Sequence, residues 1–338
     1  MKVTVIGTGF GRYAMAPVYE KLGFDVEVVT PRDKQAVARA LAAKADLVSI
    51  HAPPFLHHEL VMRAFENGQN VLCDKPFGKS LAQSQAMRDR AHESGRLHFL
   101  NFEVREKPNR AKMKQLIDSG AIGKPLHLNW TFYSNGYRHG AHGWVSDGEL
   151  GGGWINGYAS HCIDFMRWIF DSEVAQCGGI ARIEVAHHLD GGGVPRKATA
   201  EDAYSAWFVM ENGCTAVQDT AYGASVPMPM SVTIMGSEGG IQLVGDTKVV
   251  VRRAQEDLTG VPAAERIRLG LLAQEGEVYE FPPAPGEAHE PALLPWLTRV
   301  REALLTNTQI SPSFDDGLRV ATAMDQLKRN IVTVAQVC

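Results

Sequence analysis

The chain has 338 residues, of which 45% are hydrophobic and 21% charged, and its formal net charge is −4. This length predicts about two domains, and the ordinary composition disfavours a disordered, collagen-like or coiled-coil protein. Because no basic excess exists, neither nucleic acid nor an anionic membrane surface is an expected partner, and we expect a small-molecule ligand.

The cysteines and the first residues bear on the environment of the chain. The five cysteines stand singly, without a Cys-x-x-Cys pair or the spacing of a zinc site. Met1 and Lys2 lead directly into an apolar strand, so we expect no signal peptide, no membrane helix and a cytoplasmic location. His139 and His142 lack a third ligand at a recognisable spacing, and no metal is expected.

Short runs rich in Val, Ile and Leu alternate with helical stretches through the first hundred residues. The expected strands cover residues 2–6, 26–29, 47–50, 70–73 and 97–101. The expected helices cover residues 11–22, 33–43, 58–67 and 81–93, the last capped by Ser80. This alternation predicts a doubly wound parallel sheet with helices on both faces.

The pattern changes character after a helix expected to end at Ile117. Glycines at 120 and 123 mark a break, so we place the boundary near residue 120 and expect domains 1–120 and 121–338. The second domain has expected strands at 126–132, 203–210, 214–220, 231–235 and 240–244, and helices at 158–170, 292–305 and 317–332. Residues 190–195 and 281–291 are expected loops. An α+β domain with a large, mostly antiparallel sheet is therefore predicted.

A glycine-rich turn, Gly7-Thr8-Gly9-Phe10-Gly11-Arg12, follows the first strand. Glycines in such a turn let the backbone bend tightly and approach a pyrophosphate at a helix N-terminus. Because the turn opens a β-α-β-α-β pattern, we predict that these six residues bind a dinucleotide in a Rossmann fold. The third glycine stands one place early, with Arg12 in its usual position, and this is expected to shift the helix slightly.

The end of the second strand bears on the choice of coenzyme. A carboxylate there would accept from a ribose 2′-hydroxyl, but the chain has Thr30-Pro31-Arg32. Glu27 lies inside the strand and is interpreted as structural. A hydroxyl and a guanidinium suit a 2′-phosphate better, so Thr30 and Arg32 favour NADP as the form of NAD(P). A solvated Arg32 in a helix-start loop is the alternative interpretation.

Several motifs in the first 170 residues resemble the Gfo/Idh/MocA family, the relatives of glucose-fructose oxidoreductase and inositol dehydrogenase. They are residues 49–58, residues 70–76 with Asp74-Lys75-Pro76, residues 120–125, the glycine triplet 151–153, and His161 three residues ahead of Asp164. The resemblance implies a Rossmann coenzyme domain followed by a domain that completes a small-molecule active site.

The resemblance also implies roles for particular residues. Lys75 follows the fourth strand at the sheet edge where α/β proteins bind ligands, and its ammonium is expected to polarise a carbonyl or stabilise an alkoxide. His161 is expected to exchange the hydroxyl proton. Contacts with the coenzyme are expected from His51, Pro53, Asp74 and Lys75.

The chain departs from the family pattern at Gly157. Dehydrogenases of the family usually carry an aspartate there, four residues before the histidine, so the resemblance points to a subgroup without this aspartate. Asn156 or Tyr158 could occupy the space, although neither replaces a carboxylate as a base. Asp164, one helical turn after His161, is expected to orient the imidazole or cap the helix.

Two further segments supply expected substrate contacts. If residues 101–105 are extended, alternation puts Asn101, Glu103 and Arg105 on one face toward the cleft, where Glu103 and Arg105 bind substrate or pair with each other. The aromatic and basic loop 137–144 ends at Trp144 and is interpreted as a cleft lid. The expected substrate-binding set is Glu103, Arg105, Trp144, Asn156, Tyr158 and Asp164.

The leading hypothesis is hydride transfer between a nicotinamide coenzyme and a hydroxyl or carbonyl carbon of a sugar, cyclic polyol or related molecule. One alternative is a redox-neutral hydrolysis, elimination or epimerisation that uses bound NAD(P) transiently. Another is a non-catalytic dinucleotide sensor, against which the presence of both Lys75 and His161 argues. The resemblance also implies that the open sheet of the second domain pairs subunits into a homodimer or homotetramer.

Overall fold

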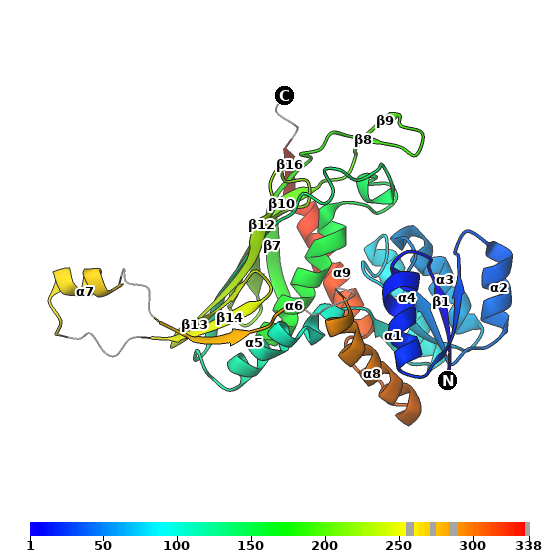
Figure 1. Ribbon diagram of the computed structural model, residues 1–338, viewed down its shortest axis with the longest axis horizontal. Coiled ribbons are helices and arrows are strands. Elements are labelled where there is room, and N and C mark those ends of the chain that lie inside the picture. Colours follow the sequence, from blue (N-terminus) through cyan, green and yellow to red (C-terminus); the bar gives the residue numbers. More distant parts are fainter. Residues whose placement is uncertain (255–259, 271–274, 284–288, 335–338) are drawn as a thin grey trace.

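The computed structural model describes residues 1–254, 260–270, 275–283 and 289–334 and shows two domains side by side (Figure 1). The first domain contains a five-stranded parallel sheet and the second a nine-stranded sheet. The prediction of a Rossmann domain followed by an α+β domain with a mostly antiparallel sheet is confirmed.

The sheet of the first domain has the order β2-β1-β3-β4-β5. Its strands are β1 (Lys2–Ile6), β2 (Asp25–Val29), β3 (Leu47–Ile50), β4 (Asn70–Cys73) and β5 (His98–Leu100). Its helices are α1 (Ala16–Lys21), α2 (Lys34–Ala42), α3 (Pro54–Glu66) and α4 (Leu81–Ser94). Every residue of β3 is buried, because helices cover both faces of the sheet. The strand order reverses between β1 and β3, and ligands of such sheets bind at that point.

The second domain is built on the sheet β15-β14-β13-β12-β6-β11-β10-β7-β16. Its strands are β6 (Pro125–Tyr133), β7 (Val174–Arg182), β10 (Ala203–Met210), β11 (Thr215–Ala221), β12 (Met228–Gly236), β13 (Gly239–Val244), β14 (Lys248–Arg253), β15 (Glu277–Glu280) and β16 (Ile331–Val334). In this sheet the pairs β6–β11 and β7–β16 are parallel, and its other strand pairs in the described residues are antiparallel.

Helices cover one face of this large sheet. They are α5 (Pro108–Asp118), α6 (Ser160–Phe170) and α9 (Phe314–Arg329), which lie on the side of the first domain (Figure 1). Helix α7 (Ala263–Gly270) lies apart from both domains. The opposite sheet face is left open, and Ile180, Trp207 and Val217 are exposed there.

The helix α8 (Glu290–Thr306) packs on the first domain although it comes late in the chain. Its Leu293, Trp296 and Val300 are fully buried in one cluster with Val3 and Phe99. Lys21 at the end of α1 donates to Glu290 at 2.6 Å. The first domain thus recruits a helix from beyond residue 120, and the division of the chain at that residue stays a prediction.

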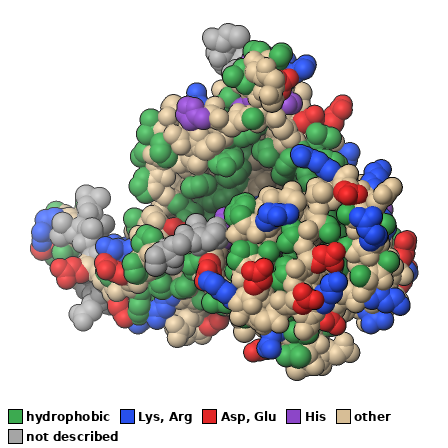
Figure 2. Space-filling view, turned by 45° about the vertical axis from the view of Figure 1, so that its right-hand side comes forward, with side chains coloured by type: hydrophobic (Ala, Val, Ile, Leu, Met, Phe, Trp, Pro, Cys, Tyr) green, Lys and Arg blue, Asp and Glu red, His purple; other side chains and the backbone are tan. Residues whose placement is uncertain are grey.

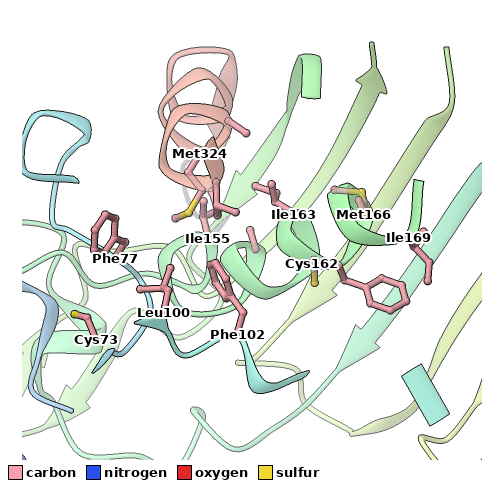
Figure 3. Packing of buried hydrophobic residues seen from close by; sticks show 14 of the residues in the cluster. Cys73, Phe77, Leu100, Phe102, Ile155, Cys162, Ile163, Met166, Ile169 and Met324 are labelled. Atoms are coloured by element: carbon pink, nitrogen blue, oxygen red, sulfur yellow. The ribbon is translucent and has the colours of Figure 1, made fainter. Parts of the chain in front are cut away.

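A second hydrophobic core runs without interruption from one domain into the other (Figure 3). Cys73 and Leu100 come from the first sheet, and Ile163 and Met166 from α6. Phe102 lies between the two groups. A shared, close-packed base of this kind holds the ends of β4 and β5 in a fixed position relative to α6. Above it, the molecule is hollowed between the domains, with hydrophobic side chains around the hollow (Figure 2).

Two local expectations differ from the structure. Residues 101–105 are not extended, because the chain leaves the sheet after β5 and forms the 3₁₀ helix η2 (Glu103–Glu106). The helix expected from residue 158 begins earlier, with the π-helical turn η4 (Ile155–Ala159). The loop expected at 190–195 is present, at the tip of a hairpin of β8 (His187–Leu189) and β9 (Pro195–Lys197). Part of the loop expected at 281–291 lies outside the described residues.

Candidate active site

The glycine turn after β1 leaves no room for side chains at two of its three glycines. Gly7 has φ +150°, and a Cβ on it would lie 2.3 Å from the His51 carbonyl oxygen. A Cβ on Gly11 would lie 2.9 Å from Val5 Cγ1. At Gly9, in contrast, a Cβ would meet nothing within 4 Å. The turn therefore packs tightly against the sheet at Gly7 and Gly11 and is open at Gly9, as the close approach of a pyrophosphate requires.

The early third glycine has a structural explanation. Gly11 makes the close helix–strand contact, whereas Arg12, in the usual glycine position, is exposed. The helix begins with the π-helical turn η1 (Gly11–Met15) before continuing as α1. Phe10 covers this turn and packs edge-on against His289, which precedes α8, with ring centroids 5.0 Å apart. The departure in spacing thus leaves the turn intact.

The end of β2 lacks a free carboxylate near the expected ribose position. Thr30 Oγ1 accepts from the Arg32 backbone N–H at 3.4 Å, and the Arg32 side chain is exposed. Asp33 stands next in the chain but caps α2, accepting from the N–H groups of Gln35 and Ala36. Glu27 lies inside β2 and pairs with Lys2, in keeping with a structural role.

A buried chain of hydrogen bonds, here called the relay, lies under the ends of β3 and β4. It joins Tyr19 OH to Ser49 Oγ (2.9 Å), Ser49 Oγ to His51 Nε2 (2.7 Å), and His51 Nδ1 to Asp74 Oδ2 (3.0 Å). A neutral His51 satisfies every link, with Nδ1 donating to the carboxylate and Nε2 accepting from Ser49. Both ring nitrogens of His51 are engaged, and its contact with a coenzyme stays a prediction, as does that of Pro53.

The other carboxylate oxygen of Asp74 is bound as well. Asp74 Oδ1 accepts from the Lys75 backbone N–H at 2.9 Å and from Asn101 Nδ2 at 3.4 Å. Burial alone would raise the pKa of Asp74, but the hydrogen bond from His51 and the charge of the Lys75 ammonium hold it at about 2. Asp74 is thus a fixed carboxylate that holds the backbone of Lys75 in place.

Lys75 connects the two domains across the site. Its Nζ donates to the Gly157 carbonyl oxygen at 2.9 Å. Gly157 belongs to the π-helical turn η4, and π-helical turns recur at functional sites. A carbonyl leaves the ammonium with further protons to donate, so the half-buried Lys75 can also bind a ligand oxygen.

His161, in the first turn of α6, faces the same lysine. Burial lowers its pKa well below the usual value, and the positive charge of Lys75 lowers it further. Its Nδ1 is buried without a hydrogen-bond partner in the described part of the chain. The ring lies across from Phe102, with centroids 6.1 Å apart. His161 is therefore a neutral imidazole with one hydrogen-bonding atom left for a ligand.

Glu103, in η2, is the second buried group with an unused polar atom. The residue is only 5% exposed, and its Oε2 has no hydrogen-bond partner among the described residues. Burial raises its pKa to about 7, the charge of Asp74 adds to this, and Lys75 opposes it. The charge of Lys75 thus acts on both Glu103 and His161, and the roles expected for the three residues stay predictions.

Arg105 and Asp164 pair with each other, which corrects two expectations. Arg105 Nε donates to Asp164 Oδ2 at 2.6 Å and its Nη2 to Asp164 Oδ1 at 2.5 Å, so the expected Glu103–Arg105 pair is wrong. Asp164 neither orients His161 nor caps α6, because this fork-to-fork pair occupies both of its oxygens. Asp316 of α9 lies 3.4 Å from Arg105 and completes a buried ionic cluster. The cluster joins η2, α6 and α9.

The residues around Gly157 are also engaged within the protein. Asn156 Nδ2 donates to the carbonyl oxygens of Gly151 (3.1 Å) and Gly152 (2.9 Å), so it does not fill the place of a missing aspartate. Tyr158 OH accepts from Trp130 Nε1 at 3.0 Å. A Cβ on Gly157 itself would meet only Trp154 Cε3 at 3.8 Å. The position is thus open, and neither neighbour supplies a base there.

Trp144 is half-buried in the 3₁₀ turn η3 (Trp144–Ser146) of the preceding loop. Its carbonyl oxygen would lie 2.2 Å from a Cβ on Gly152, which explains why the glycine triplet tolerates no side chain there. The role of Trp144 in substrate binding stays a prediction.

One side-chain cluster has the composition of a metal site but not its chemistry. In the described residues, His92, His98 and Asp315 bring three ligand atoms within 4.8 Å of one another. His98 Nδ1 accepts from the Phe314 backbone N–H, so its other nitrogen carries the proton and has no lone pair for an ion. His92 Nε2 lies 3.0 Å from Asp315 instead, as in an ordinary surface pair.

Sequence reasoning missed three residues near the site. Lys107, at the start of α5, acts electrostatically on both Glu103 and His161 and donates to Asp246 at 2.7 Å. The charge of His289 also lowers the pKa of His161. His57 is buried between the loops after β3 and β4, 2.7 Å from Ala52 O and 3.0 Å from Pro76 O. Lys107 adjoins the predicted segment, but no local pattern points to His289, which lies more than a hundred residues away.

Comparisons with known proteins agree with this geometry. A profile described as "Oxidoreductase family, NAD-binding Rossmann fold" matches residues 1–102. A second, described as "GFO/IDH/MocA C-terminal domain", matches residues 111–242. The chain belongs to the Gfo/Idh/MocA family. Membership of a subgroup without the catalytic aspartate stays a prediction, and so do the roles of the individual residues.

Individual relatives of this Gfo/Idh/MocA protein are distant. An uncharacterized oxidoreductase of Synechocystis sp. is 27% identical over 190 residues, which are 50% of this chain and 51% of that protein, so the chain spans about half of that relative's length. Levoglucosan dehydrogenase of Pseudarthrobacter phenanthrenivorans is 24% identical over 309 residues, 83% of this chain and 76% of the enzyme.

The fold recurs in a solved structure described as levoglucosan dehydrogenase in complex with NADH and L-sorbose. The TM-score is 0.82 at 19% identity, with 98% of this chain and 96% of that chain covered. The expected preference for NADP finds no support in these matches, whose coenzyme is NAD or NADH. In the described residues, no helix is both long and apolar enough to cross a lipid bilayer.

Proposed function

We propose that this protein is an NAD(H)-dependent dehydrogenase or reductase that acts on a CH–OH or C=O carbon of a sugar or cyclic polyol. The observation that carries the proposal is the position of Lys75. Its ammonium stands at the carboxyl edge of the Rossmann sheet, at the end of β4, and reaches across to Gly157 beside His161 of the second domain.

The residues fit a dinucleotide. The turn from Gly7 to Gly11 is open above Gly9, where a pyrophosphate would approach. Thr30 and Arg32 stand at the end of β2, where the adenosine ribose would bind. When bound, NAD⁺ or NADH supplies the hydride acceptor or donor. The relatives that act on sugars, among them levoglucosan dehydrogenase, support this substrate class.

The protein side of the chemistry follows from charge and hydrogen bonding. Lys75 donates to the reacting oxygen and stabilises the negative charge that develops there on alcohol oxidation. The relay fixes the backbone that carries Lys75, so the ammonium is positioned before substrate binds. His161, as a neutral imidazole, offers the oxygen a second hydrogen bond.

The test is the absorbance of reduced coenzyme at 340 nm with purified protein, NAD⁺ and a panel of levoglucosan, hexoses and inositols. The account predicts an increase with at least one member, and a loss of absorbance when the matching ketone or lactone is offered with NADH. Turnover of a panel member without any change at 340 nm would favour the redox-neutral alternative, and coenzyme binding without turnover would favour a sensor.

We also propose that the open face of the nine-stranded sheet pairs two copies of the chain. Trp207 and Ile180 are each 46% exposed on this face, and Val217 lies opposite Trp207 on the neighbouring strand. Monomers rarely leave a contiguous apolar sheet face in water. Sedimentation should give a dimer or a multiple of it, and Trp207→Arg should shift the protein to monomer while leaving its melting temperature within a few degrees. The cytoplasmic location also stays a prediction.

A further inference from the structure

The carboxyl group of Glu103 is buried within reach of the charges of Asp74 and Lys75, and one of its oxygens has no partner in the described residues. Oε2 is among the buried polar atoms without a hydrogen bond in the described residues. Leaving such an atom unpaired costs free energy, so buried unpaired oxygens are rare and call for a physical reason. Phe102, the preceding residue, packs in the shared core (Figure 3), so the backbone of η2 cannot easily turn the carboxyl away.

The charged and titratable groups around Glu103 come from every element that packs on η2. Asp74 and Lys75 follow β4, and Lys107 begins α5. The remaining groups are His161 and the Arg105–Asp164 pair on the α6 side, and the Glu106–Arg299 pair on the α8 side. Lys107 donates to Asp246 and Lys75 donates to the Gly157 carbonyl, so each lysine has a partner other than Glu103. No ion pair therefore neutralises Glu103 in the described residues.

His161 is poorly suited to take a full proton. The charges of Asp74, Lys75 and Lys107 act on both His161 and Glu103. A second positive charge beside the Lys75 ammonium, in a buried place, is unfavourable. A carboxylate that takes a proton becomes neutral instead, and burial and the charge of Asp74 favour that neutral form of Glu103. Of these two titratable side chains with an unpaired buried atom, Glu103 is therefore the better proton acceptor.

From this geometry we infer that Glu103 is the catalytic residue that accepts the substrate's hydroxyl proton during oxidation and returns it during reduction. The inference rests on the proposed function. In the oxidative direction the O–H bond breaks and its proton goes to Glu103 Oε2, while the C–H bond breaks and its hydride goes to the oxidised coenzyme. A C=O bond forms, and the products are the carbonyl compound, reduced coenzyme and neutral Glu103. His161 then holds the substrate oxygen through a hydrogen bond and does not change its charge.

The first arm of the test measures stability and needs no coenzyme. Glu103 has a pKa of about 7 in the folded chain against an ordinary value of 4.5, so the folded state favours its protonated form. The wild-type chain therefore loses stability relative to a chain without this carboxyl as pH rises from about 4.5 through about 7. Glu103→Gln should melt at a higher temperature than wild type at about pH 8.5, and the advantage should vanish at about pH 5.

The matched control is Glu106→Gln, in the same helical turn. Glu106 pairs with Arg299 on α8, and Lys75 has no part in this pair. Its replacement should not raise the melting temperature at the higher pH. Equal losses for Glu103→Gln at both pH values would show an ordinary structural glutamate and would overturn the inference.

The second arm measures kcat and KM against pH with NAD⁺ and the best sugar or inositol of the panel. Wild type should show an oxidation rate that rises with pH around a midpoint near 7. Glu103→Gln should lose this rise and about 10²- to 10⁴-fold in kcat, with KM for NAD⁺ unchanged, and Glu103→Asp should restore part of both. His161→Asn should be slower yet keep the midpoint.

The outcomes separate this inference from the proposed function. If wild type binds NADH and turns over, but the pH midpoint survives in Glu103→Gln and disappears in His161→Asn, Glu103 is not the proton acceptor. If wild type fails to bind NADH, the proposed function falls, and this catalytic role with it. The stability arm would still report whether Glu103 holds a proton near neutral pH.

Discussion

The two sides of the site use their polar atoms differently. On the coenzyme side, the relay from Tyr19 to Asp74 leaves no ring nitrogen or carboxylate oxygen unpaired. On the side that faces α6, Glu103 Oε2 and His161 Nδ1 are buried without partners in the described residues. A network in which every polar atom is hydrogen-bonded holds its side chains in one geometry, whereas an unpaired buried atom is able to bind a ligand. The comparison supports the proposal that Lys75 is held in place from one side and meets a ligand on the other.

The ionic cluster beneath the α6 side carries the largest expected effect on stability. Arg105→Met would leave Asp164 buried without its fork of donors, and breaking such a buried pair costs about 3–5 kcal/mol. Urea denaturation should show this loss. Arg299→Met is the control, because its partner Glu106 belongs to a more exposed pair worth about 0–1 kcal/mol. Similar losses in both variants would mean that the cluster does not anchor η2 to α6.

Lys75→Met tests whether the Lys75 ammonium serves the reaction or the stability of the fold. Removing the donor aimed at the reacting oxygen should lower kcat by about 10²- to 10³-fold. The relay does not involve Nζ, so the melting temperature and the affinity for NADH should change little. A large loss of stability with unchanged kcat would assign Lys75 to the structure instead.

Asp74→Asn tests the saturated side. The pKa of Asp74 lies at about 2 against an ordinary 3.8, so its ionised form stabilises the fold above about pH 4 and loses this effect as pH falls toward 2. We expect the variant to be about 2 kcal/mol less stable at pH 7. The gap to wild type should close in acid. A constant gap down to pH 2 would show that charge is not what Asp74 contributes.

The smallest effect is expected at the exposed end of β2. Arg32→Ala should weaken NADPH binding by about 2- to 5-fold, the range of an exposed charge pair, and leave NADH binding unchanged. Fluorescence titration with both coenzymes measures it. Equal changes in the affinities for NADPH and NADH would show that Arg32 does not distinguish the two coenzymes.

The sequence is informative where a signal is local. Strands β1, β3 and β4 have the predicted bounds, because buried parallel strands are continuous apolar runs. The glycine turn and Lys75 are likewise tied to short motifs. Strand β7 was missed because Gly178 and Gly179 interrupt its apolar pattern, and the reason for them, the Trp207 ring over Gly178, lies on another strand.

Partners distant in sequence could not be predicted. Arg105 and Asp164 are 59 residues apart, and whether Arg105 pairs with Glu103 or with Asp164 depends on how η2 meets α6. The relay likewise joins Tyr19 to Asp74 through two other segments. Which buried oxygen is left unpaired emerges only once all other partners are assigned, so Glu103 could be named from the sequence but its state could not.

The most direct test of the account is a titration with NADH, followed by its fluorescence, of wild type and Gly9→Val. A Cβ on Gly9 touches nothing within 4 Å, so the variant should keep its melting temperature. The added side chain would occupy the space above the turn that the pyrophosphate needs. We predict saturable binding of one NADH per chain in wild type and its loss in Gly9→Val. Absence of binding in wild type, or equal binding in both, would contradict the account.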